Sequence, residues 1–239
     1  MNELITVFLE NMTFVAVCAA IIVGLGLLAR LAERFLPQLH RVSPARRASI
    51  IALCAALAAV LQLLDFPLLF LAPSFYKLDF SELPVMLSGF YLGPSAAVAC
   101  EGIKILLKLL LKGTSTAFVG EFANFAVGCA FVLPAVIIYH LHKSRKSAVV
   151  GLVVGTVVLT VFGSAFNAIY LLPKFAQLYG TSLEEIIAMG SKICEAIRDL
   201  PTFVLLAVAP LNLIKGVCVS VLTLLLYKRA ARPLFGLHS

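Results

Sequence analysis

The sequence predicts an all-α fold, a polytopic integral membrane helix bundle. Of its 239 residues, 62% are hydrophobic and only 13% are charged, whereas soluble domains contain about 45–50% apolar and about 25% charged residues. The apolar residues fall in runs close to the roughly 20 residues that one bilayer-spanning helix needs. A chain of this length accommodates six or seven spans with short loops and leaves no room for a sizeable soluble domain.

Three regions follow one another in the predicted bundle. Residues 1–35 are expected to form an additional N-terminal transmembrane helix, because their apolar run is too long for a cleaved signal peptide and lacks a basic start. Residues 36–47 are expected to form a basic cytoplasmic linker, and residues 48–232 a six-helix membrane domain. The six expected helices cover about residues 48–69, 80–92, 94–111, 118–139, 148–172 and 202–227.

The segment at residues 77–93 changes from a charged loop to an apolar helix within a few residues. Asp79 and Glu82 lie one helical turn apart at this change, and Pro84 falls in the opening turn, where a missing N–H costs nothing. The two carboxylates belong either to a helix cap or to a ligand site.

The one long loop, residues 174–199, is expected to contain an amphipathic helix on the outer membrane face. Ser182 is a candidate N-cap, and Glu185 follows three residues later, which is the capping-box pattern. Apolar and charged residues then alternate at helical spacing, as in an interfacial helix.

Basic residues set the expected orientation. The loop after the first span, the loop after the fifth and the C-terminal tail together hold about twice as many Lys and Arg as the opposite loops, and the richer side faces the cytoplasm. We therefore interpret the net charge of +7 as a topology signal and not as a nucleic-acid surface. The C-terminus is expected in the cytoplasm and, with seven spans, the N-terminus outside the cell.

Polar residues in membrane spans are costly, so each one calls for a reason. If the outer helix ends converge, their polar residues form a pocket open to the outside. Asn212 and Lys215 share one helix face, and together they offer donors and acceptors suited to an uncharged ring system rich in carbonyls and amides. Aromatic walls are expected from Tyr76, Phe80, Phe166 and Tyr170.

Several of these residues also have purely structural interpretations. Asp79 and Ser81 are typical helix caps, and Glu121 suits the positive end of its helix. Glu101 and Lys104, three residues apart, favour an internal ion pair.

Two lysines have structural interpretations as well. Lys108 is expected to extend to the outer interface. Lys215 has the alternative of a structural ion pair with Glu82 or Glu121.

Three alanines, Ala48, Ala52 and Ala56, recur every four residues in the first helix of the six-helix domain. Small residues at this spacing let another helix approach closely, which favours a partner-docking face. The plain alternative is that alanine is common in membrane helices.

No catalytic or metal-binding pattern emerges from the sequence. Five of the six cysteines lie inside apolar runs, with neither a disulfide framework nor a zinc spacing. There is no GxxxxGK[ST] motif for ATP. We therefore expect a binding protein; a membrane-embedded enzyme using Glu82 or Glu121 is the less favoured alternative.

Five sequence blocks occur together in this chain: KLDFSELP at residues 77–84, GTST at 113–116, GEFANF at 120–125, NAIYLLP at 167–173 and NLIK at 212–215. They resemble the riboflavin-specific S components of energy-coupling factor (ECF) transporters. The resemblance covers about residues 49–227, so the first helix is an addition to the family's pattern.

This resemblance implies a six-helix S-component core that captures riboflavin from outside the cell and uses no cofactor. It implies a partner in the lipid bilayer, an ECF module of one transmembrane scaffold protein and two ATPase subunits, with the alanine face of the first core helix as the docking face. The implied substrate-binding residues are Leu78, Asp79, Phe80, Glu82, Thr114, Thr116, Glu121, Asn124, Asn167, Tyr170, Asn212 and Lys215.

Two features depart from the family pattern. The additional helix has no counterpart, and the long loop at residues 174–199 either acts as a lid or changes the specificity. The alternative function is therefore an S component for another vitamin or flavin, such as FMN or a thiamine-like compound.

Overall fold

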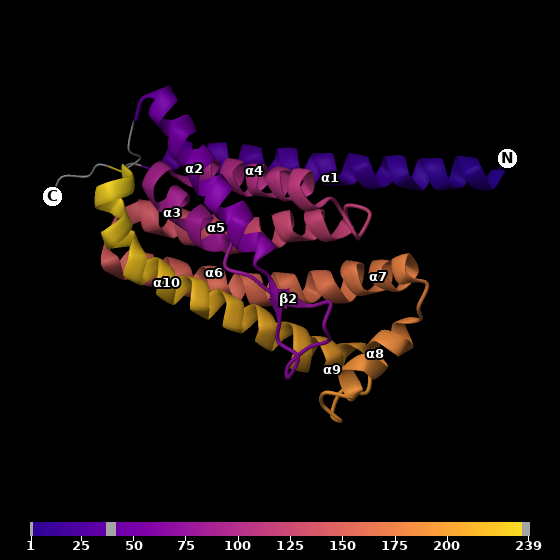
Figure 1. The fold of residues 1–239 in the computed structure, drawn as a ribbon. Helices are drawn as coiled ribbons and strands as arrows, with labels where there is room; N and C mark the ends of the chain where they lie inside the picture. Colours follow the sequence, from indigo (N-terminus) through magenta and orange to yellow (C-terminus); the bar gives the residue numbers. More distant parts are fainter. Residues whose placement is uncertain (1, 37–41, 236–239) are drawn as a thin grey trace.

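The computed structural model describes residues 2–36 and 42–235 and shows one bundle of long helices that lie side by side (Figure 1). The short helices α7, α8 and α9 gather at one end of this bundle. The elements are α1 (Asn2–Phe35), α2 (Pro44–Leu63), β1 (Phe66–Pro67), β2 (Lys77–Leu78), α3 (Glu82–Leu92), α4 (Pro94–Lys112), α5 (Val119–His142), α6 (Arg145–Phe166), η1 (Asn167–Leu171), α7 (Leu172–Tyr179), α8 (Leu183–Ser191), α9 (Leu200–Phe203), η2 (Val204–Val208) and α10 (Ala209–Phe235).

The all-α membrane bundle predicted from composition is confirmed. Within the described residues, five helical stretches are long and apolar enough to cross a membrane. Helices α3 and α4 fall outside this set, because α3 has only 11 residues and α4 carries several charges along its 19 residues. The number of spans therefore stays a prediction.

The expected end of the first core helix at residue 69 is wrong. Helix α2 ends at Leu63, and the chain then forms a small hairpin in which Phe66 pairs with Leu78 and Pro67 with Lys77. Pro67 cannot continue a helix, and it is tolerated at the end of a short edge strand. The hairpin brings the segment that carries Asp79 back over the end of α2.

The basic linker is shorter than expected. Residues 37–41 lie outside the described part of the chain, and Ser43 already caps α2 by accepting a hydrogen bond from the backbone N–H of Arg46 at 3.4 Å. Pro44 occupies the first turn of that helix, where its missing N–H is harmless.

The fifth core helix also extends further than expected. Helix α6 continues through the π-helical turn η1 into α7 and ends at Tyr179, so the long loop begins at Gly180, whose φ is +63°. Pro173 sits in the first turn of α7 and does not break the rod. Beyond it, the capping box of Ser182 and Glu185 starts α8, as predicted.

The bundle core lies where α2, α3, α5, α6 and α10 meet. Here Phe90 stacks on Tyr139, with ring centroids 4.4 Å apart, and Tyr227 donates to or accepts from the Tyr139 hydroxyl at 2.8 Å. Burial of these large rings supplies much of the packing free energy. Helix α3, which contributes many residues to this core, lies toward the end of the bundle opposite α7, α8 and α9 (Figure 1).

The additional helix α1 packs along α4 and α5. Ala29 and Leu25 contact an apolar cluster that includes Val98 and Leu133. At the end of α1, Glu33 accepts hydrogen bonds from the backbone N–H and the hydroxyl of Ser95, at 2.9 and 2.7 Å. Since α4 has a glycine at its N-cap, α1 supplies the side-chain cap that α4 lacks.

We predict that Glu33→Ala lowers the stability of the protein by about 0.5–2 kcal/mol, the usual effect of losing an N-cap. Thermal unfolding in detergent would measure the change. Arg34→Ala, at the exposed neighbouring position on α1, is the control and should leave the melting temperature unchanged. Equal melting temperatures for the two variants would contradict a capping role.

Candidate functional site

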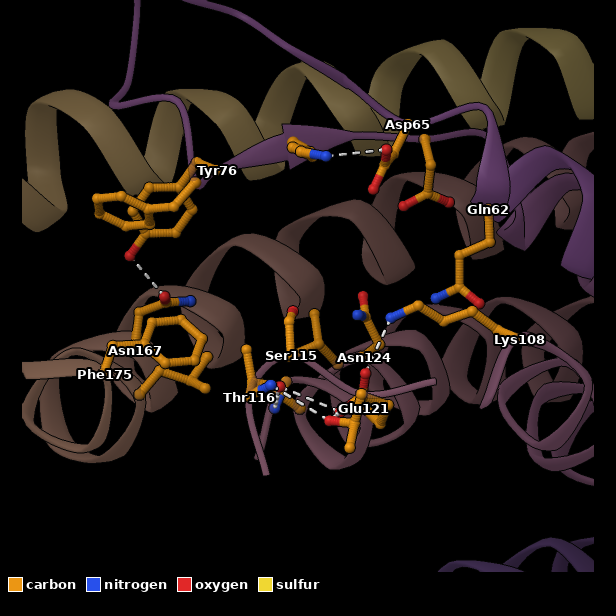
Figure 2. Close-up of a pocket in the computed structure, with 18 of the residues that line it drawn as sticks. Gln62, Asp65, Tyr76, Lys108, Ser115, Thr116, Glu121, Asn124, Asn167 and Phe175 are labelled. Carbon is orange, nitrogen blue, oxygen red and sulfur yellow. Dashed lines mark hydrogen bonds and ion pairs between the residues drawn. The ribbon is translucent and has the colours of Figure 1, made fainter. Parts of the chain in front are cut away.

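A cavity of about 450 Å³ lies between the β1–β2 hairpin and one set of helix ends. Its wall is formed by the end of α2, the hairpin, the end of α4, the start of α5, η1, α7 and the start of α10. Figure 2 shows Tyr76, Asn167 and Phe175 at one end of the cavity, with Gln62 and Lys108 at the other. The volume lies in the range of pockets that hold small organic ligands.

The structure places eight of the twelve predicted substrate-binding residues around this cavity, although they come from five segments of the chain. Those that line it are Asp79, Thr114, Thr116, Glu121, Asn124, Asn167, Asn212 and Lys215.

Four predicted site residues lie outside the cavity wall, for different reasons. Leu78 is buried in β2. Phe80 packs against the bundle core and lies 6.1 Å from the ring of Phe66. Tyr170 stacks on Phe166, with ring centroids 5.2 Å apart, since the π-turn rotates it away from the cavity side that Asn167 occupies. Glu82 lies behind the wall, in the ionic network described next.

Lys215 is held by two carboxylates, Asp79 in the loop before α3 and Glu82 at the start of α3. Its ammonium lies 3.1 Å from Asp79, and 3.0 and 2.9 Å from the two carboxylate oxygens of Glu82. The predicted alternative pair with Glu82 is therefore present, whereas Glu121 pairs with Lys108. Burial raises the pKa of the Asp79 carboxyl, but the nearby ammonium groups more than offset this effect and lower that pKa to about 2.

Glu121 is already saturated by neighbouring side chains. Lys108 donates to one of its oxygens at 3.1 Å, and Thr114 and Thr116 donate to the other at 2.9 and 3.1 Å. Thr114 also accepts from the backbone N–H of Phe118, a residue with φ +68°. These residues line the cavity but are used to build the loop between α4 and α5.

The expectation that Lys108 extends to the outer interface is wrong. Its side chain points into the cavity and pairs with Glu121 (Figure 2). A signal was present in the sequence, because Glu101, Lys104 and Lys108 follow one another at helical spacing and so share one face of α4.

Asn167 is also engaged within the protein. Its side-chain carbonyl accepts from the hydroxyl of Tyr76 at 2.7 Å, and its amide donates to the backbone carbonyl of Gly163 at 2.7 Å. Asn167 begins the π-helical turn η1. Such single π-turns re-aim side chains and are frequent at functional sites. Tyr76, expected as an aromatic wall, therefore also orients an amide of the site.

Asn212 differs from the other polar residues of the wall. Its amide nitrogen is buried and has no hydrogen-bond partner among the described residues. It packs against Gly163, where an added Cβ would lie 2.8 Å from that nitrogen. A buried donor without a partner is unfavourable by about 1–3 kcal/mol. A ligand that placed an acceptor beside the Asn212 amide would remove this cost.

Sequence reasoning missed several residues of the wall. Gln62 lies in the last turn of α2 and is buried. Phe175 and Tyr179 reach the cavity only because α7 continues past Pro173. Gln62 was detectable as a lone amide in an apolar helix. Asp65, Lys77 and Lys112 meet at the mouth, where Lys77 lies 3.1 Å and Lys112 3.8 Å from the Asp65 carboxylate.

Comparison with known proteins identifies a family that this sequence matches. The family model for the substrate-specific component of ECF transporters matches residues 46–227. The chain belongs to this family. It is a membrane transporter component and not an enzyme, and the family membership indicates no cofactor.

Curated relatives agree with the family assignment. The chain is 33% identical over 186 residues to the riboflavin transporter RibU of Staphylococcus aureus, covering 78% of this chain and 90% of that protein. It is 31% identical over 180 residues to the riboflavin transporter FmnP of Bacillus subtilis, covering 74% and 88%.

A solved structure of the S component of a bacterial ECF transporter is similar to this one. The TM-score is 0.63 at 35% sequence identity, and the match covers 80% of this chain and 98% of that chain. Because the family match begins at residue 46, α1 lies outside the shared core, as predicted from the sequence.

We predict that Glu121→Ala loosens the loop between α4 and α5, because Thr114 and Thr116 lose their shared acceptor. Amide hydrogen exchange of residues 116–120 should become about tenfold faster, the effect of losing about 1.4 kcal/mol of local stability. Glu184→Ala, at an exposed position in the first turn of α8, is the matched control. Unchanged exchange in Glu121→Ala would contradict the structural role of this carboxylate.

Proposed function

We propose that this protein captures riboflavin at the outer membrane face and delivers it inward together with an ECF module. Two relatives, 33% and 31% identical to this chain over the aligned residues, are named riboflavin transporters. The cavity adds an independent argument, since its chemistry suits a flavin.

The observation that carries the proposal is the pair of unused donors at Asn212 and Lys215. A lysine ammonium has three N–H groups, and Lys215 directs bonds to Asp79 and Glu82, which leaves one for a ligand. The Asn212 amide lies one turn earlier on α10 and has no partner among the described residues. Both residues line the cavity, and the carbonyl edge of an isoalloxazine ring would supply the acceptors for their N–H groups.

The opposite end of the cavity offers aromatic surface. Phe75 lies 4.8 Å from Tyr76 and 6.5 Å from Phe175, measured between ring centroids. Flat heteroaromatic rings pack favourably against such surfaces. We therefore assign the flavin ring to the space between this aromatic cluster and α10.

A second candidate ligand, FMN, is favoured by the charges at the mouth. Lys77 and Lys112 share the single carboxylate of Asp65, and the side chains of both lysines are partly exposed. An unneutralised positive charge there would suit a phosphate at the end of the ribityl chain. Competition between riboflavin and FMN, measured with Lys112→Met as well, separates the two ligands.

The docking face is assigned to α2. Ala48, Ala52 and Ala56 are all exposed along this helix, whereas Ala55 and Ala59 point into the core. Membership in the family implies association with an ECF module. A row of exposed small side chains would allow a partner helix to approach the backbone closely.

We place the cavity at the outer membrane face. The C-terminal ends of α1, α5 and α10, next to which the sequence places the basic residues expected in the cytoplasm, lie at one end of the bundle (Figure 1). Helix α7, which lines the cavity, lies toward the other end. The positive-inside tendency then orients the cavity outward. Accessibility labelling of a cysteine introduced at Gly180 would test this orientation.

We predict that protein purified after growth with riboflavin releases about one flavin per chain on denaturation. Asn212→Ala should weaken riboflavin binding about tenfold or more, because a hydrogen bond to a buried amide or charged group contributes about 1–3 kcal/mol. Quenching of riboflavin fluorescence measures the affinity. Thr223→Val, on the same helix but bonded only to its own helix backbone, is the control. Wild-type protein that neither carries nor quenches riboflavin would exclude this vitamin.

We predict that Ala52→Leu disrupts assembly with the ECF module and leaves riboflavin affinity unchanged, because the added side chain blocks close helix approach at the exposed α2 face. Co-purification with the module measures assembly. Ala165→Leu, at an exposed position of α6, adds the same bulk elsewhere. Normal assembly of the Ala52→Leu variant would move the docking face away from α2.

A further inference from the structure

Lys104 is a fully buried cation that the proposed site does not yet explain. It lies on α4, outside the described residues that line the cavity. Its ammonium donates to the hydroxyl of Ser81 at 3.1 Å, reaches Glu82 at 3.5 Å and makes a short contact with Glu101. The ion pair predicted between Glu101 and Lys104 is therefore only one part of a larger network.

The contacts of Lys104 close into a ring with those of Lys215. Lys104 binds Glu82, which binds Lys215, which in turn binds Asp79. Asp79 accepts from the backbone N–H of Ser81 at 2.8 Å, and Ser81 leads back to Lys104. Every member of the ring is buried, so water contributes little to holding these groups.

Within this ring, Lys104 and Lys215 occupy different places. Lys215 faces the cavity, whereas Lys104 lies one layer behind it. Both carboxylates that hold Lys215 depend on Lys104, Glu82 by direct contact and Asp79 through Ser81. The position of the Lys215 ammonium is therefore set from α4, although α4 contributes neither of its carboxylate partners.

We propose that Lys104 is a positioning residue of the binding site, acting through Glu82 and Ser81 to aim the remaining N–H of Lys215 into the cavity. This inference rests on the proposed function, since it assigns a role in binding the flavin. Without Lys104, Glu82 has a single cationic partner and Glu101 loses the cation beside it. Lys215 then satisfies these carboxylates and withdraws from the ligand.

Ser81→Ala is the mildest test, because it removes the hydroxyl that Lys104 binds and leaves every charge in place. Lys104→Met removes the cation itself. We expect riboflavin affinity to fall about threefold in the first variant and about tenfold or more in the second, in the range of a lost hydrogen bond to a charged group. Leu152→Ala, in the buried face of α6, is the control that lowers stability without changing affinity.

A double-mutant cycle distinguishes positioning from general destabilisation. If Lys104 acts through Lys215, Ser81→Ala and Lys104→Met should each change affinity less than about twofold in a Lys215→Met background, because coupled residues are not additive. A merely structural role predicts the same loss in both backgrounds. Additive losses, or an unchanged affinity of Ser81→Ala in otherwise wild-type protein, would overturn the proposal.

Even if Lys104→Met does not fold, the cycle with Ser81→Ala still tests whether Lys104 acts through Lys215. Ser81→Ala removes only a hydroxyl and leaves no buried charge unpaired. Failure of the proposed function has a different signature. Wild-type protein would then bind no riboflavin at all, whereas failure of this inference leaves wild-type binding intact and only the coupling absent.

Discussion

The buried charges around Lys215 constrain the whole bundle. A carboxylate or an ammonium in an apolar interior is costly unless it is paired and hydrogen-bonded. The loop before α3 contributes Asp79, α3 begins with Glu82, and α10 contributes Lys215. These three segments have to meet at one point, and α4 joins them through Lys104. The fold thus places a cluster of paired charges directly behind the cavity, where the pairs support the wall of the proposed binding site.

Hydrogen-bond saturation separates the polar residues of the cavity into two kinds. Both carboxylate oxygens of Glu121, and both the carbonyl and the amide nitrogen of Asn167, make hydrogen bonds within the protein. Asn212 has a buried donor with no partner among the described residues. Groups of the first kind hold loops and turns in place, and those of the second are available to a ligand. This distinction depends on contacts between distant segments, so residue type alone does not reveal it.

The sequence predicted the helices well where apolar runs are long, because burial in lipid requires continuous helix. It failed where geometry is local and unusual. The hairpin after α2 depends on pairing between Phe66 and Leu78, and the continuation of α6 into α7 depends on a π-turn that accommodates Pro173. Eight of the twelve predicted site residues line one cavity. Glu82 lies behind it, since spacing identifies polar helix ends but not the layer in which a side chain lies.

The additional helix fits this arrangement without competing with it. Helix α1 packs on α4 and α5, and its Glu33 caps α4 and lies 3.6 Å from Arg47 at the start of α2. The alanine face of α2 stays exposed beside it. A helix that strengthens α4 also steadies Lys104, which lies on that helix about two and a half turns further along. Support for the ligand-facing lysine therefore extends from the binding cavity through α4 to the segment that distinguishes this chain from the shared family core.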